Sequence, residues 1–77
     1  MSGDTFKILA DYLETQVLVR LKGGRTIKGI LKSYDQHLNL ILADAEEVDS
    51  KSGSTRPLGL LMVRGDNVVL ISPAPQG

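Results

Sequence analysis

Five short runs of apolar residues follow one another after Thr15, and they constrain the fold of this chain more than any other feature. In the first run the side chains alternate, with Val17, Val19 and Leu21 on one face, which is the pattern of a half-buried β-strand. Glycine, proline and small polar residues, which favour turns, separate the runs. The predicted strands are residues 16–22, 26–33, 38–48, 58–63 and 67–72.

A single helix is predicted before the first strand. Over residues 4–14 the apolar residues recur at i, i+3, i+4 and i+7, on one helix face, and they are Phe6, Leu9, Ala10 and Leu13. One helix and five strands on short connections predict a strongly bent antiparallel meander that forms a small open barrel. Gly29 falls on the inward face of the second strand, where a missing side chain marks a bend or a bulge.

Length and composition place the chain among small globular proteins. Its 77 residues make one domain with a marginal core, for which self-association is a common remedy. It contains no cysteine, so disulfides and thiolate metal sites are excluded. No apolar run approaches the roughly 20 residues of a membrane-spanning helix, and no signal peptide is recognisable. We therefore predict a cytoplasmic protein with no cofactor and no membrane partner.

Alternating turns bring polar residues together at one end of the predicted sheet. Successive turns of a meander lie at opposite ends, so Gly23–Gly24 and the polar loop 49–57 share one end. The turns at 34–37 and 64–67 then share the other end. A lone histidine at a turn is usually just a solvated residue, but five polar side chains gathered there make a candidate site. These are Asp35, His37, Asn39, Arg64 and Asp66.

Two segments resemble the paired motifs of the Sm and Sm-like (LSm) family. Residues 17–48 are similar to the first motif, with its mid-strand glycine and its Asp-x-His-x-Asn signature. Residues 58–72 are similar to the second motif, built around Arg-Gly-Asp-Asn. The resemblance implies the Sm fold, with a variable loop at 49–57 and a short tail at 73–77. It also implies an archaeal-type homo-oligomeric ring, typically of seven subunits.

The resemblance further implies a ligand and a role for each site residue. Rings of this family bind single-stranded, uridine-rich RNA near the central pore and act in RNA processing, RNA stability or ribonucleoprotein assembly, with RNA-processing proteins as further partners. Carried over, the resemblance places His37 and Arg64 on the two faces of a base and makes Asn39 the reader of its edge. Asp35 and Asp66 become supports that orient the others. The implied RNA-binding residues are Asp35, His37, Asn39, Arg64, Gly65 and Asp66.

The same residue types suit RNA on chemical grounds alone. Imidazole and guanidinium groups are flat and stack on nucleobases. The edge of uracil presents an N–H group flanked by carbonyl oxygens, and an asparagine amide offers one acceptor and two donors to match. The formal net charge of zero argues against binding through bulk electrostatic attraction. A ring, however, repeats one local arginine and histidine around a single pore.

Other classes of function fit the sequence less well than RNA binding. Ser33, Asp35 and His37 are residue types of a hydrolytic triad, but no glycine-rich nucleophile elbow accompanies them. A metal site of His37, Asp35 and Asp66 would have mixed ligands and no second histidine, which is a poor match. We therefore predict no catalytic activity and no metal. The alternative function is a protein-interaction scaffold ring in which RNA binding is secondary.

Basic residues on the first two strands are a weaker signal. Between Glu14 and Asp35 every charged residue is basic. Lys22, Lys28 and Lys32 could add secondary contacts to RNA. Such lysines more often simply keep an exposed strand soluble, so they carry no assignment from the sequence alone.

Overall fold

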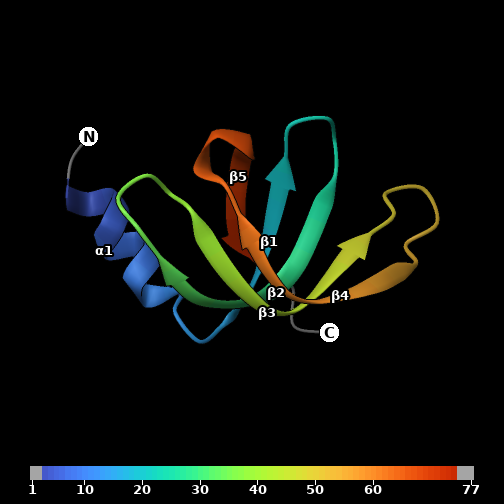
Figure 1. The fold of residues 1–77 in the computed structure, drawn as a ribbon, viewed down its shortest axis with the longest axis horizontal. Coiled ribbons are helices and arrows are strands. Elements are labelled where there is room, and N and C mark those ends of the chain that lie inside the picture. The colour runs from blue at the N-terminus through green and yellow to red at the C-terminus, as the bar shows by residue number, and fades with distance from the viewer. Residues whose placement is uncertain (1–2, 75–77) are drawn as a thin grey trace.

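The computed structural model describes residues 3–74, which form one helix and one five-stranded sheet (Figure 1). The elements are α1 (Gly3–Asp11), β1 (Gln16–Leu21), β2 (Thr26–Tyr34), β3 (Leu40–Val48), β4 (Thr55–Val63), the 3₁₀ turn η1 (Gly65–Asn67) and β5 (Val68–Pro73). The predicted fold class, a helix followed by a bent antiparallel sheet, is confirmed. Among residues 3–74 no helix is long and apolar enough to cross a membrane. Residues 75–77 of the predicted tail and the side chain of Phe6 lie outside the described part.

The strand order is β4-β3-β2-β1-β5, and every described pair is antiparallel. The first four strands form the predicted meander. The meander does not continue to β5, which pairs with β1 rather than with β4: Val19 lies opposite Ile71 (Figure 1). The strong bend of the sheet brings the free edge of β1 to the place where the chain leaves η1, so β5 pairs there. The sheet therefore keeps two edges, β4 and β5.

The helix is shorter than the predicted span 4–14, because the chain turns away after Asp11. The next amide, Tyr12 N–H, donates to Leu9 O at 3.0 Å, three residues back, which is turn geometry rather than α-helix geometry. Glu14 then adopts a φ of 65°, and its N–H donates to Leu31 O at 2.8 Å on β2. The hydrogen bond from Glu14 to β2 thus ends the helix at Asp11, before the apolar pattern ends at Leu13.

Two strand boundaries differ from the prediction by more than one residue. The third strand begins at Leu40 and not at residue 38, because Leu38 has a φ of 63° and belongs to the preceding turn. The fourth strand begins at Thr55, since Thr55 pairs with Val48, so the loop spans 49–54 instead of 49–57. Polar composition favoured a longer loop, but pairing with the far end of β3 extends the strand.

The core is aliphatic and lies on the concave face of the sheet. Burying one such side chain contributes about 1.5–3 kcal/mol. Leu9 of α1 is also buried, and Tyr12 packs against the cluster after the helix ends. The cluster consists of Val17, Val19, Ile27, Leu31, Leu40, Leu42, Ala45 and Val63.

Gly29 lies where β2 packs closely against β3. A Cβ atom at this position would lie 3.2 Å from Ala43 O, from Ala45 Cα and from Leu42 Cβ. The pairing register of β2 with β3 shifts at this point, between Lys28 and Ile30. The predicted irregularity at the mid-strand glycine is therefore present, and it lets the sheet curl around its core.

Candidate nucleic-acid interface

The turn between β2 and β3 meets the turn between β4 and β5. Asp35 N–H donates to Asn39 O at 3.1 Å and closes the first turn, while Asn67 N–H donates to Arg64 O at 3.0 Å and closes the second. A hydrogen bond joins them: Gly65 N–H donates to Asn39 Oδ1 at 2.7 Å, across 26 residues of sequence. The structure thus brings together the two turns that the sequence predicted at the same end of the sheet.

The carboxylate of Asp35 organises the first turn. Its Oδ1 accepts from His37 N–H at 2.8 Å and from Asn39 N–H at 3.1 Å, and its Oδ2 accepts from Asn39 Nδ2 at 2.9 Å. The hydrogen bond from the Asn39 side chain is the largest cause of a lowered pKa for the Asp35 carboxyl, with the two backbone donors and nearby His37 adding to it. The charged form of Asp35 therefore holds the turn and the Asn39 amide together.

The amide of Asn39 is fixed in one orientation from both sides. Its oxygen accepts from Gly65 N–H, and its nitrogen donates to Asp35, so turning the amide over would break both bonds. An asparagine side chain has two N–H donors and an oxygen with two lone pairs. One donor and one lone pair of Asn39 therefore remain for a ligand.

Gly65 allows the two turns to approach this closely. A Cβ atom built on Gly65 would overlap the carbonyl oxygen of His37 and crowd Leu38 C at 3.0 Å. The φ of Gly65 is not among the positive values of the chain, so the need for glycine here is one of space. The sequence resemblance included Gly65 in the site without giving this reason.

His37, Arg64 and Asp66 surround an open hollow of about 470 Å³, which Asn39 and Gly65 also line. The Arg64 side chain is 75% exposed and pairs with Asp66, with 3.3 Å between Nη2 and Oδ2. Exposed ion pairs of this kind contribute only about 0–1 kcal/mol, so the Arg64 guanidinium can change partners at little cost. Asp35 does not line this hollow and lies behind Asn39.

This geometry gives little support to catalysis or metal binding. The oxygens of Asp35 are engaged by two backbone N–H groups and by Asn39, so they hold the turn rather than orient the imidazole of His37 towards Ser33. Within residues 3–74 no group of three or more His, Asp or Glu side chains is placed to hold a metal ion.

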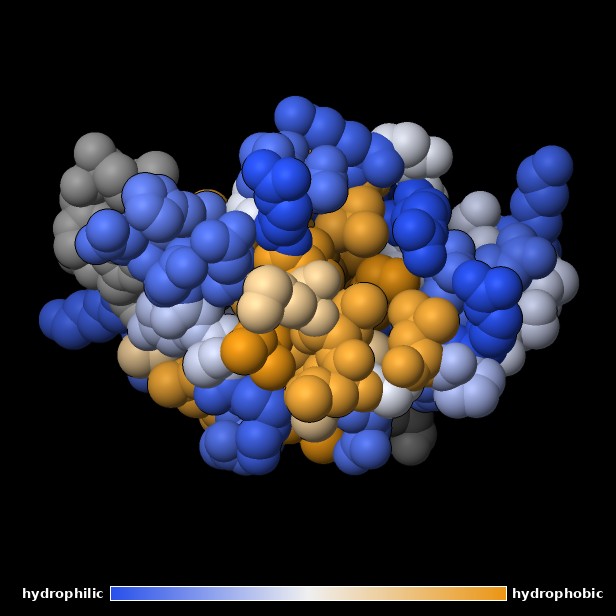
Figure 2. Space-filling model, in the orientation of Figure 1, coloured by the Kyte–Doolittle hydropathy of each residue, from blue (hydrophilic) through white to orange (hydrophobic). Residues whose placement is uncertain are grey.

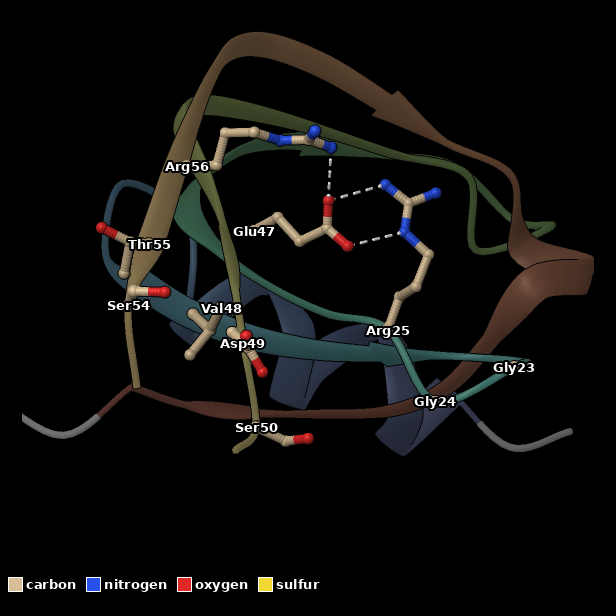
Figure 3. Close-up of a pocket in the computed structure, with 10 residues that line it drawn as sticks. All are labelled: Gly23, Gly24, Arg25, Glu47, Val48, Asp49, Ser50, Ser54, Thr55 and Arg56. Atoms are coloured by element: carbon tan, nitrogen blue, oxygen red, sulfur yellow. Dashed lines mark hydrogen bonds and ion pairs between the residues drawn. The ribbon is translucent and has the colours of Figure 1, made fainter. Parts of the chain in front are cut away.

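Sequence reasoning missed a second polar cluster, at the opposite end of the sheet. Arg25 donates through Nε and Nη2 to Glu47 at 3.0 and 3.2 Å, and Arg56 Nη2 donates to the same carboxylate at 2.8 Å (Figure 3). The predicted loop 49–57 contained Arg56, which concealed its pairing with Glu47 across β3 and β4. The sequence held no signal for it, because regular alternation from Leu40 and Leu42 would place Glu47 on the outer face. The irregularity at Asp44, which has a φ of 51°, moves Glu47 to the face of its partner Ile27.

The fold and the two joined turns define an Sm-type domain, and comparisons with known proteins agree. The family model for the LSM domain matches residues 7–73. An Sm-like protein of Aeropyrum pernix is 59% identical over 70 residues, which are 91% of this chain and 88% of that protein. The chain belongs to the LSM-domain family.

Solved structures match equally well. A heptameric archaeal Sm protein has a TM-score of 0.83 and 48% identity, with 90% of this chain and 98% of that one covered. The Sm protein of Pyrococcus abyssii, solved in complex with a uridine heptamer, has a TM-score of 0.80 and 40% identity, with 90% and 96% covered. The archaeal type suggested by the sequence is thereby supported.

The support that Asp35 gives to Asn39 leads to a testable result. Asp35→Asn replaces one of two acceptor oxygens with a donor that would face Asn39 Nδ2, so the amide loses its anchor. We expect affinity for oligo-uridine at neutral pH to fall several-fold in this variant. In the parent, the lowered pKa keeps Asp35 charged at mildly acidic pH, so binding should weaken only as pH falls below the ordinary carboxyl value of 3.8.

Fluorescence anisotropy of labelled oligo-uridine across this pH range is the measurement. The charge-matched control is Asp44→Asn, at an exposed position with a φ of 51° that asparagine tolerates well. Parent-like binding by Asp35→Asn would show that the Asn39 amide needs no carboxylate to hold it.

Proposed function

We propose that this chain binds single-stranded, uridine-rich RNA as a subunit of a homo-oligomeric ring of seven. The observation that carries the proposal is the Asn39 amide, held from both sides beside an open hollow that His37 and Arg64 also line. The uridine heptamer bound by the Pyrococcus relative supports the ligand, and the heptameric archaeal relative supports the ring.

The fixed amide gives a chemical reason for preferring uracil. With Oδ1 and Nδ2 each keeping one free site, Asn39 can accept from the N3–H group of uracil and donate to its neighbouring carbonyl oxygen. Cytosine presents an amino group where uracil has that carbonyl. The N–H of a fixed Asn39 amide would then face the amino group of cytosine, and two donors cannot form a hydrogen bond. His37 and Arg64 would stack on the base and hold it, whatever its identity.

The two unpaired edges of the sheet support the ring. β4 exposes Leu60 and Met62, at 76% and 68%, and β5 exposes Val69 and Leu70, at 59% and 51%. Apolar residues gather in the middle of the face that β4 crosses (Figure 2). Pairing β4 of one subunit with β5 of the next covers both edges and buries these side chains, and repetition around a rotation axis closes a ring.

Ring assembly is directly testable. We expect native mass spectrometry to give seven times the 8.3 kDa chain mass. Met62→Glu should shift this population towards smaller species, because it places a charge in the proposed contact of the β4 edge, whereas Leu13→Glu, outside both edges, should not. A folded monomer of the parent at micromolar concentration would contradict the ring.

Within this proposal the protein is a binding protein rather than an enzyme. Its cellular setting is proposed as the cytoplasm, in RNA processing, RNA stability or ribonucleoprotein assembly together with RNA-processing proteins. A scaffold ring for which RNA is incidental is the competing function. Sequencing of RNA that copurifies with the parent, compared with an Asn39→Ala variant, separates the two, because only the first predicts enrichment of uridine-rich RNA that depends on Asn39.

A further inference from the structure

The cluster of Arg25, Glu47 and Arg56 borders an open pocket of about 430 Å³ between the Gly23–Gly24 turn and loop 49–54. In Figure 3 both guanidinium groups converge on the carboxylate of Glu47, that of Arg56 from above and that of Arg25 from the right. Glu47 accepts three N–H groups, and two guanidinium groups carry ten in all. Most of the donors therefore remain free, on side chains that are 55% and 72% exposed for Arg25 and Arg56.

The two sites differ in charge. At the candidate uridine site, Arg64 stands against Asp35 and Asp66, a formal net charge of −1 with His37 neutral. Lys22 lies beside this site, since its N–H donates to Asn67 O at 2.9 Å. Around the second pocket three cations stand against two carboxylates, a formal net charge of +1. The cations are Arg25, Lys51 and Arg56, and the carboxylates are Glu47 and Asp49.

The acids around this second pocket are already engaged. Glu47 is bound by both arginines, and its lowered pKa arises first from the hydrogen bond with Arg25. Asp49 Oδ1 accepts from Lys51 N–H at 2.9 Å within the loop. Glu46 lies one residue from Glu47, so it points to the outward face, where its partner in register is Lys28. Cationic donors are thus the groups left available to a ligand.

We propose that this pocket is a second RNA contact, which binds phosphate groups of the backbone through Arg25 and Arg56. Paired guanidinium groups are suited to phosphate because each presents a planar fork of donors. The negative charge of Glu47 holds the two guanidinium groups next to each other. Without Glu47 their like charges would repel. The inference rests on the proposed function: the uridine site reads bases but has no surplus positive charge, so the backbone of the RNA needs cationic donors outside that site.

Phosphate contacts distinguish the two sites. The bend of the sheet brings the sites near each other, because Arg25 and Arg64 line one pocket of about 280 Å³. A uridine trinucleotide carries only a few phosphate groups, whereas a long oligo-uridine offers many of them to the arginines. Phosphate contacts also carry a signature, because each one lost lowers the slope of log affinity against log salt by about one.

The experiment measures binding of both RNAs by the intact protein over a series of salt concentrations. We expect Arg56→Gln to bind the long strand several-fold more weakly, with a slope lower by at least about one, and to weaken binding of the trinucleotide less. Lys51→Gln, at an exposed position in loop 49–54, should act in the same direction, and the side chain of Lys51 makes no hydrogen bond or ion pair within residues 3–74 whose loss could unfold the chain. The charge-matched control is Lys7→Gln, exposed on α1.

Equal slopes for the parent and both variants would overturn the proposal. So would an equal fall in trinucleotide affinity, which would mean that the variants damage the ring or the first site, and so would an equal effect of Lys7→Gln. If the parent fails to bind the trinucleotide, the proposed function fails instead. The slope for the long strand still decides whether the pocket binds phosphate.

Discussion

Gly65→Val is expected to abolish measurable binding of oligo-uridine. Any Cβ atom at position 65 meets the carbonyl oxygen of His37, and neither a Cβ nor a backbone carbonyl can move unless its backbone moves, so the two turns must separate. Separation breaks the hydrogen bond from Gly65 N–H to Asn39 Oδ1 and moves Arg64 away from His37. Losing that bond alone costs about 1–3 kcal/mol when the partner stays unsatisfied, and the stacking of every bound base is lost as well.

A control separates this steric effect from the general cost of removing a glycine. Gly53 has a φ of 75°, and a Cβ atom added there would have nothing within 4 Å, so Gly53→Ala introduces strain without a collision. We expect Gly53→Ala to lose some stability and keep its RNA affinity. Circular dichroism and native mass spectrometry should show that Gly65→Val still folds. Retained oligo-uridine binding in Gly65→Val would mean that the contact between the turns is dispensable.

Arg64→Ala is expected to have the second largest effect. Stacking contributes about 1–3 kcal/mol per base, and a ring loses it at every subunit, so the affinity of a heptanucleotide should fall by several orders of magnitude. Arg64→Lys should restore little of this, because an ammonium keeps the charge but lacks the planar face. His37→Ala should weaken binding for the same reason as Arg64→Ala.

Equilibrium binding of a uridine heptamer at one fixed salt concentration measures these effects. The matched control is Arg20→Lys, an exposed arginine on β1 away from both turns. If Arg64→Lys binds like the parent, Arg64 contributes only its charge, and the proposal that its guanidinium group stacks on the base is wrong.

The regular part of the fold could be predicted from the sequence because each strand carries its own period. The alternation of Val17, Val19 and Leu21 predicts a strand regardless of which strands lie beside it, and Gly29 marks the bend. The partner of β5 could not be predicted in this way. Pairing with β1 depends on how strongly the sheet curls, a property of all five strands together.

The boundaries were missed where a contact distant in sequence overrides local composition. The bond from Glu14 N–H to Leu31 O ends the helix early, and the pairing of Thr55 with Val48 takes residues from a polar loop. The positive φ of Leu38 is a third case. Leucine seldom adopts this conformation, so its sequence gives no warning of it.

The sequence predicted that the two turns lie together, but it did not predict their contacts. The alternation of turns brought Asp35 and Asn39 to the end where Arg64 lies, and the resemblance added Gly65; their roles in RNA binding stay predictions. Which donor meets which acceptor could not be known until the side chains were placed. That Gly65 is required for space, and that its N–H fixes the Asn39 amide, are results of the structure.

The central claim is that the fixed Asn39 amide reads uracil, and competition between oligo-uridine and oligo-cytidine at one salt concentration tests it most directly. The parent should prefer uridine. Asn39→Ala should narrow that preference while keeping some affinity for both, because stacking does not distinguish bases. Asn39→Asp should bind uridine more weakly still, because it adds a negative charge and removes the donor. If Asn39→Ala keeps the full preference of the parent for uridine, another group reads the base and the claim is wrong.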